Sequence, residues 1–146
     1  MKISSSQFSH QGKIPTKYSG EGQDLSPPLE FSEIPEGTIS LALVVDDPDA
    51  PMGTFDHWVV WNLKPDLSGL TEGSCPGKEG KNDFGRTSYG GPMPPKGHGS
   101  HRYFFTLYAL NTSLELPEGS RKKQLLDAIK EHTIDSAVLI GTYERA

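Results

Sequence analysis

The segment Ile39-Ser40-Leu41-Ala42-Leu43-Val44-Val45-Asp46-Asp47 says most about the architecture of this chain. Leu41, Leu43 and Val45 alternate with Ala42 and Val44, so both faces of an extended segment would carry apolar side chains. A short run of this kind is typical of a strand that is buried on both faces. We therefore predict a central strand over residues 39 to 47.

Three more segments predict strands because they are rich in aromatic and β-branched residues: Phe55 to Leu63, His101 to Leu110, and Ala137 to Tyr143. Shorter extended pieces are expected at Ile3 to Phe8 and at Ile14 to Tyr18. The strands do not alternate with helices, as the strands of a parallel sheet would. The sequence therefore predicts an antiparallel sandwich or barrel-like fold.

One segment, Ser120 to His132, predicts a helix. Ser120 is a favourable N-cap residue, and Leu125, Leu126 and Ile129 form an apolar stripe beside charged residues. We expect this helix to serve as a packing element.

The composition supports a loop-rich β domain. Gly and Pro together make 28 of the 146 residues, about 19%, against about 12% in average proteins. Because these are the two poorest helix formers, the surplus argues against a helix bundle. The length suits one hydrophobic core, so we expect residues 1 to 146 to form a single domain.

Charge and apolar runs exclude several classes of partner. The 14 Lys and Arg against 19 Asp and Glu give a net charge of −5, which disfavours nucleic acids and anionic membrane surfaces. No apolar run approaches the roughly 20 residues of a membrane span, and the first residues lack the apolar core of a signal peptide. Cys75 is the only cysteine, so no internal disulfide is possible and a cytoplasmic location is expected.

Residues 64 to 100 show little strand or helix pattern. Long connections of this kind in compact domains are usually functional or disordered. Phe84, Tyr89 and Met93 offer apolar anchors, and the run Gly90-Gly91-Pro92-Met93-Pro94-Pro95 restricts the backbone. We therefore expect an ordered loop that shapes a site.

Two polar clusters lie at strand ends. Asp47 lies in the stiff turn Asp46 to Pro51, on the same strand face as Val45, and is expected to point inward. The alternative is that Asp side chains in this turn cap backbone N–H groups. His57 and Trp58 are neighbours in a strand and should lie on opposite faces. His57 by itself fits either a hydrogen-bonded core histidine or a functional one.

A third cluster, Gly97-His98-Gly99-Ser100-His101-Arg102-Tyr103, ends the long loop. His101 and Tyr103 are two residues apart on one strand face, and two donors beside flexible glycines suit an anion or a phosphate ester. Arg102 points to the other face, where we expect an ion pair with a carboxylate rather than a phosphate clamp.

The clusters give little support for catalysis. Ser100 and His101 would diverge on a strand, so they make a poor pair of nucleophile and base, and no G-x-S-x-G or phosphate-binding glycine motif is present. No recognised zinc spacing occurs, so no metal or other cofactor is expected. A metal site judged by residue type alone would use Asp47, Asp49, His57, His98 and His101.

Together, in this order and spacing, the clusters become specific. Asp47-Pro48-Asp49-Ala50-Pro51, His57-Trp58 and the motif from Tyr89-Gly90-Gly91-Pro92 through Pro94-Pro95 to His101-Arg102-Tyr103 resemble the phosphatidylethanolamine-binding protein family, also called the Raf kinase inhibitor-like family. Asn82-Asp83-Phe84-Gly85 and Gly141-Thr142-Tyr143 look like its short bacterial and archaeal branch. The resemblance runs from about Ser26 to Arg145.

This resemblance implies a two-sheet antiparallel β-sandwich with one or two peripheral helices and a small pocket for anions such as phosphate. Carried over motif by motif, the ligand-binding residues would be Asp47, Ala50, Pro51, His57, Pro94, Pro95, His101 and Tyr103. Ser88 and Met93 depart from residues that are usual in this branch. The chain lacks the longer C-terminal part of animal relatives, which favours small anions over lipid-sized ligands.

Three functions fit these features. The first is non-enzymatic binding of a small anionic or phosphorylated ligand, such as phosphate or a phosphoethanolamine-like head group, to imidazole, backbone N–H and Tyr hydroxyl donors. The second is a regulator that inhibits a kinase or protease through protein contacts. The third is a phosphoester hydrolase built on Asp47, His57 and His101.

The oligomeric state is open at this stage. A homodimer is the commonest soluble oligomer. The large side chains that would suit either its interface or the core are Trp58, Trp61 and Phe104.

Overall fold

The computed structural model describes all 146 residues and contains two sheets. The strands of the larger sheet are β2 (Gly12–Lys13), β4 (Ser40–Asp47), β5 (Phe55–Leu63), β7 (Lys78–Glu79), β8 (His101–Leu110) and β9 (Thr133–Tyr143). Those of the smaller sheet are β1 (Lys2–Ser4), β3 (Leu29–Ser32) and β6 (Gly69–Leu70). Their spatial orders are β2-β9-β8-β4-β5-β7 and β1-β3-β6, and every pairing is antiparallel except that of β2 with β9.

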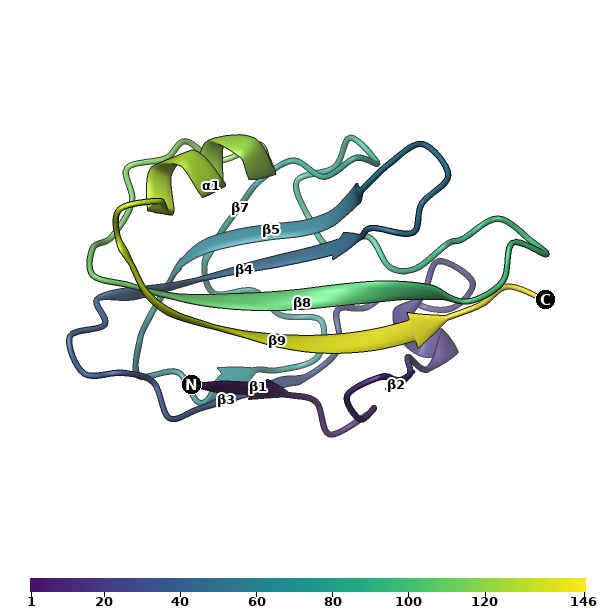
Figure 1. Ribbon diagram of the computed structural model, residues 1–146, viewed down its shortest axis with the longest axis horizontal. Coiled ribbons are helices and arrows are strands. Elements are labelled where there is room, and N and C mark those ends of the chain that lie inside the picture. Colours follow the sequence, from purple (N-terminus) through teal and green to yellow (C-terminus); the bar gives the residue numbers. More distant parts are fainter.

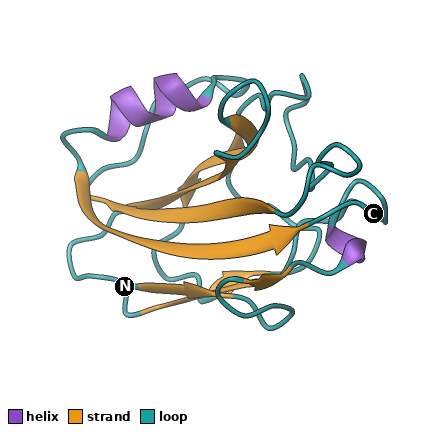
Figure 2. Cartoon of the chain, turned by 45° about the vertical axis from the view of Figure 1, so that its right-hand side comes forward, coloured by secondary structure: helices purple, strands orange, loops and turns teal.

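The elements form three layers (Figure 2). The smaller sheet covers one face of the larger sheet, and the helix α1 (Lys122–Ile129) lies over part of the other face (Figure 1). The predicted two-sheet antiparallel sandwich is therefore confirmed, with α1 and a single turn of 3-10 helix, η1 (Thr16–Tyr18), as the peripheral helices.

The central strand β4 is buried on both faces, as its sequence predicts. Leu41, Leu43 and Val45 belong to the core between the two sheets. Ala42 and Val44 belong to a second apolar cluster. This cluster also contains Trp61 from β5 and Leu125 and Ile129 from α1. Because both neighbours of β4 in the sheet are long strands, the end of β4 is a rigid position for a site.

The helix is shorter than the predicted segment Ser120 to His132, and its N-cap is a different residue. The backbone N–H of Arg121 donates to Gln124 Oε1 at 2.7 Å, which marks the start of α1. Ser120 instead donates its hydroxyl to the Pro117 carbonyl at 2.7 Å, within the preceding turn. A serine at a turn can bond to nearby backbone in more than one way, so the expected N-cap was wrong.

Other boundaries differ at the periphery. Thr16 to Tyr18 form η1 rather than the predicted extended piece, and β1 covers only part of the piece predicted at Ile3 to Phe8. β9 begins at Thr133, four residues before the predicted start. The limits of β5 and β8 agree with the prediction, and β4 begins one residue later than expected.

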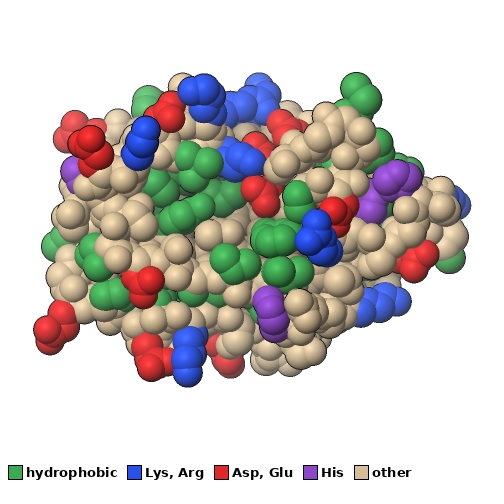
Figure 3. Space-filling model, in the orientation of Figure 1, with side chains coloured by type: hydrophobic (Ala, Val, Ile, Leu, Met, Phe, Trp, Pro, Cys, Tyr) green, Lys and Arg blue, Asp and Glu red, His purple; other side chains and the backbone are tan.

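The outer face of the larger sheet is only partly covered by α1. Hydrophobic side chains gather on this face (Figure 3), where Val138 of β9 is 45% exposed and Phe104 of β8 is half-buried. Trp58 and Trp61 are core residues, so neither anchors an interface, and the homodimer stays a prediction. No helix of the chain has the length and apolar character that crossing a membrane requires.

Candidate functional site

A cavity of about 550 Å³ lies at the end of the sandwich where β4 ends and β8 begins. All eight residues that the sequence predicts for the site line it: Asp47, Ala50, Pro51, His57, Pro94, Pro95, His101 and Tyr103. They come from residues 47 to 57 and from residues 94 to 103, which are distant in sequence and meet at the right-hand end of the molecule in Figure 1. The sequence reasoning did not place seven further lining residues here: Met52, Gly53, Thr54, Phe55, Asp83, Phe84 and Met93.

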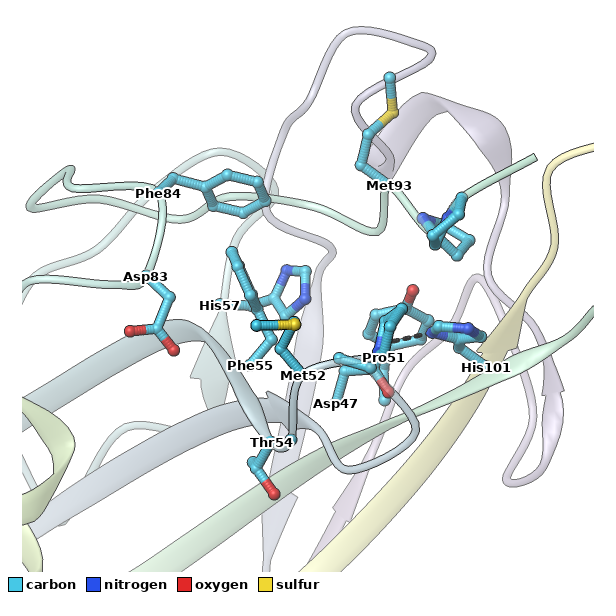
Figure 4. A pocket seen from close by; sticks show the side chains of 15 residues that line it. Asp47, Pro51, Met52, Thr54, Phe55, His57, Asp83, Phe84, Met93 and His101 are labelled. Atoms are coloured by element: carbon cyan, nitrogen blue, oxygen red, sulfur yellow. Dashed lines mark hydrogen bonds and ion pairs between the residues drawn. The ribbon is translucent and has the colours of Figure 1, made fainter. Parts of the chain in front are cut away.

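Asp47 and His101 form a buried pair that joins the end of β4 to the start of β8. His101 Nδ1 lies 2.7 Å from Asp47 Oδ2, and these residues are only 2% and 3% exposed. The other carboxylate oxygen, Oδ1, accepts the backbone N–H of Asp49 at 2.7 Å. Asp47 therefore points inward, as its parity predicts, and also caps the turn, so both roles foreseen for it are present. Figure 4 shows the pair as a dashed line.

A β-bulge aims His57 into the cavity. Val45 of β4 is paired with Trp58 and Asp46 is paired with Asp56, so His57 is an extra residue with no partner on β4. Its ring packs edge-on against Tyr103, with centroids 5.2 Å apart, and Trp58 belongs to the same intersheet core as Tyr103. The prediction that His57 and Trp58 lie on opposite faces is wrong, because a bulge interrupts the alternation of side chains along a strand.

The protonation of His57 follows from its surroundings. Its Nδ1 lies 2.7 Å from the Gly90 carbonyl, which can only accept, so Nδ1 carries the proton. Burial lowers the pKa of His57 below its ordinary value of 6.5, although this carbonyl and the charge of Asp47 act in the opposite direction. The imidazole is therefore neutral near pH 7, and its Nε2 is an acceptor.

Tyr103 supplies a buried hydroxyl without a protein partner. The residue is 1% exposed, and its Oη makes no hydrogen bond of good geometry with a protein group, although the Asp47 carboxylate lies close to it. Burial and the nearby charge of Asp47 raise the pKa of Tyr103 well above its usual range, so the hydroxyl stays protonated. A buried hydroxyl in a cavity wall can donate a hydrogen bond to an incoming ligand.

Asn82, for which the sequence predicted only membership in a family motif, holds the loop around the site. Its side-chain amide donates to the carbonyls of His57 and Ser88, and its Oδ1 accepts the backbone N–H groups of Phe84 and Arg86. The sequence signal for this role was an Asn in a turn, because such a side chain readily bonds to nearby backbone.

Of the apolar anchors expected in this loop, only Tyr89 is buried, whereas Phe84 and Met93 are 39% and 41% exposed.

Arg102 makes an ion pair on the far side of β8, as predicted. Its Nε and Nη2 lie 2.9 and 2.8 Å from the two carboxylate oxygens of Asp49, and its backbone N–H donates to the same carboxylate. The side-chain hydrogen bond from Arg102 lowers the pKa of Asp49 to about 2. The Arg102 side chain is 55% exposed and does not line the cavity, so the pair fixes the turn beside the site.

The charge in the cavity is unusual for an anion site. Among the lining residues the only charged types besides histidine are Asp47 and Asp83, and no Lys or Arg is present. Asp83 is already paired with Arg121 at 3.0 Å. No group of three or more potential metal ligands comes together anywhere in the chain.

The mouth of the cavity is apolar. Met52, which lines the cavity, is 99% exposed, and the lining side chains of Phe84 and Met93 are partly exposed. Phe84 and Met93 lie on different sides of the His57 ring in Figure 4. Large exposed apolar side chains that gather at one place mark a binding surface more often than scattered ones do.

Comparisons with known proteins show the family and agree with the fold. Residues 4–144 match the family described as phosphatidylethanolamine-binding protein. A UPF0098 protein of Pyrococcus horikoshii is 45% identical over an alignment of 150 positions, which covers 97% of this chain and 75% of that protein. A Chlamydia trachomatis structure, described as a homologue of phosphatidylethanolamine-binding protein, has 43% identity and a TM-score of 0.95 and covers 99% of this chain and 97% of its own. Escherichia coli YbcL, described as a new member of the mammalian family, has 29% identity and a TM-score of 0.92, with 99% and 98% covered.

Proposed function

Because the chain belongs to the phosphatidylethanolamine-binding protein family, we propose that its cavity binds a small anionic or phosphorylated ligand without transforming it. One observation carries the proposal. Two buried imidazoles and the buried, unpartnered hydroxyl of Tyr103 line the same cavity. Phosphate oxygens accept hydrogen bonds from such groups, and the bonds strengthen when an imidazole is protonated.

Binding of an anion here must be coupled to a proton. The Nδ1 protons of His57 and His101 already face a carbonyl and a carboxylate, which only accept. A neutral ring therefore has no further proton to donate to the ligand. Either the ligand brings its own proton, as a phosphoester monoanion does, or a histidine takes one up. With no Lys or Arg in the wall, we expect binding to weaken as the pH rises from 6 to 8.

Calorimetric titration with phosphoethanolamine and inorganic phosphate at pH 6 and pH 8 tests this proposal. Performed in two buffers of different ionisation heat, the titration also counts the protons taken up. We expect tighter binding at pH 6, and loss of binding in His57→Gln combined with Tyr103→Phe. His132→Gln, which alters a histidine bonded to Asn111 at the α1 end of the fold, is the matched control. The absence of heat and of any shift in the imidazole NMR signals at both pH values would refute the proposal.

A second candidate function, regulation of a protein partner, is favoured by the apolar mouth around Met52. Such a partner would bind the His57→Gln, Tyr103→Phe variant normally but would be lost from Met52→Ser. Turnover of a phosphoester that disappears in His101→Ala would instead indicate the hydrolase.

A further inference from the structure

His98, which does not line the cavity, contacts the histidine that does. His98 Nδ1 lies 2.6 Å from His101 Nε2, and the two rings meet edge-on at 67° with centroids 4.8 Å apart. The other nitrogen of His101, Nδ1, is bonded to Asp47. Both ring nitrogens of His101 are therefore hydrogen-bonded to protein groups, and in this conformation neither nitrogen is available to a ligand.

The protons of this chain of groups can be assigned. The Asp47 carboxylate accepts, so His101 Nδ1 carries a proton. In neutral His101, Nε2 then carries a lone pair, which accepts a hydrogen bond from the protonated Nδ1 of His98. If His101 is charged instead, its Nε2 proton points at His98 Nδ1. In either state the bond between the rings must break before an oxyanion can receive a hydrogen bond from His101.

His98 is placed where moving it is easy. The residue is exposed, and the glycines on either side of it have φ values of +74° and +86° with open space around them. Glycine adopts and leaves such conformations at low cost. The backbone bonds that hold this turn are long: Gly97 N–H to the Arg145 carbonyl at 3.4 Å and His98 N–H to the Pro95 carbonyl at 3.2 Å. By contrast, Asp47 and His101 are fixed by strands and by burial.

We propose that His98 is a latch that competes with the ligand for His101 Nε2, so that an oxyanion binds only when the glycine-flanked turn swings out. This inference rests on the proposed function. His98 is thus a positioning residue, because it acts on the ligand through His101. The latch makes the affinity lower than the same cavity would otherwise give, since each binding event must break one histidine–histidine hydrogen bond.

Two variants of His98 separate the latch from a merely structural role. His98→Ala removes the competing nitrogen, whereas His98→Asn keeps a side-chain N–H close to the position of Nδ1. With inorganic phosphate as the probe at pH 7, we expect His98→Ala to bind about three- to tenfold more tightly than the wild type, the factor that loss of one ordinary hydrogen bond gives. His98→Asn should bind as the wild type does. His132→Ala serves as the control.

A second measurement needs no ligand. Long-range ¹H–¹⁵N spectra of the imidazoles should show a shift of the His101 Nε2 signal in His98→Ala and no such shift in His98→Asn or in the control. An unshifted signal, or phosphate affinity that is unchanged or weaker in His98→Ala, overturns the latch alone. If neither the wild type nor any variant binds phosphate or phosphoethanolamine, the proposed function fails and the latch fails with it.

Discussion

Replacing Tyr103 by Phe should change stability and ligand binding in opposite directions. The substitution removes one hydroxyl and keeps the ring that packs against His57 at 5.2 Å. In the ligand-free protein this hydroxyl is buried and makes no hydrogen bond to the protein. A buried hydroxyl without a partner costs about 1–3 kcal/mol relative to water, so its loss relieves the folded state of part of that cost.

We expect the free energy of unfolding to rise by up to about 1 kcal/mol, which corresponds to about 2–5 °C in Tm for a chain of this size. Binding should move the other way. The hydroxyl can donate a charge-assisted bond to a phosphate oxygen, and losing such a bond weakens affinity by about ten- to a hundredfold. Urea denaturation and calorimetric titration with phosphate, on the same preparations, measure the two effects.

Tyr143→Phe is the matched control for stability. Tyr143 lies on β9 next to the site and is 3% exposed, but its hydroxyl donates to Glu21 Oε1 at 2.5 Å and accepts from Ser19 Oγ at 3.0 Å. This variant should lose about 1–3 kcal/mol, because it breaks the bond to the Glu21 carboxylate and the bond from the buried Ser19. If Tyr103→Phe is destabilised as much as Tyr143→Phe, the Tyr103 hydroxyl has a partner in solution and our reasoning is wrong.

Three further variants test the electrostatics. Burial lowers the pKa of His57 below 6.5, so the unfolded chain binds more protons; stability should fall as the pH drops from 7 towards 5, and His57→Gln should flatten that slope in urea denaturation. Arg102 holds the pKa of Asp49 at about 2, so ¹³C NMR should show its carboxyl ionised at pH 3, and in Arg102→Met its titration should move up towards 3.8. Lys122 Nζ lies 2.6 Å from Asp56 Oδ1, and burial already raises the pKa of that carboxyl; Lys122→Met should cost about 1–3 kcal/mol at pH 7 and regain part of it at pH 5, whereas a loss that does not depend on pH would contradict this account.

The central strands could be predicted from the sequence because their side chains follow a simple rule. Residues alternate between two faces, and in β4 both sets are apolar, which only a strand between two apolar layers requires. The same rule placed His101 and Tyr103 together in the cavity. The periphery was less predictable, because elements such as η1 depend on contacts that local propensity does not contain.

The eight residues predicted for the site line the cavity, but three aspects of the geometry around it were not predictable. The strand rule failed at His57, since a bulge depends on how β5 pairs with β4 and leaves no mark in the local sequence. The contact between His98 and His101 likewise depends on a turn with two left-handed glycines, one on either side of His98. The role of Asn82 is set by four backbone groups brought to it by folding.

The bulge in β5 makes the site depend on a count of residues as well as on their identity. Without the extra residue, Trp58 and Asp56 could still face Val45 and Asp46, and the pairing of β4 with β5 would be regular at this point. A one-residue deletion at this point would therefore preserve the fold and erase one imidazole of the cavity. During divergence or engineering of such chains, a change of length here is a more effective way to lose the site than most substitutions. A relative should accordingly be judged by the spacing between its first Asp motif and its His-Trp pair, before its pocket residues are compared one by one.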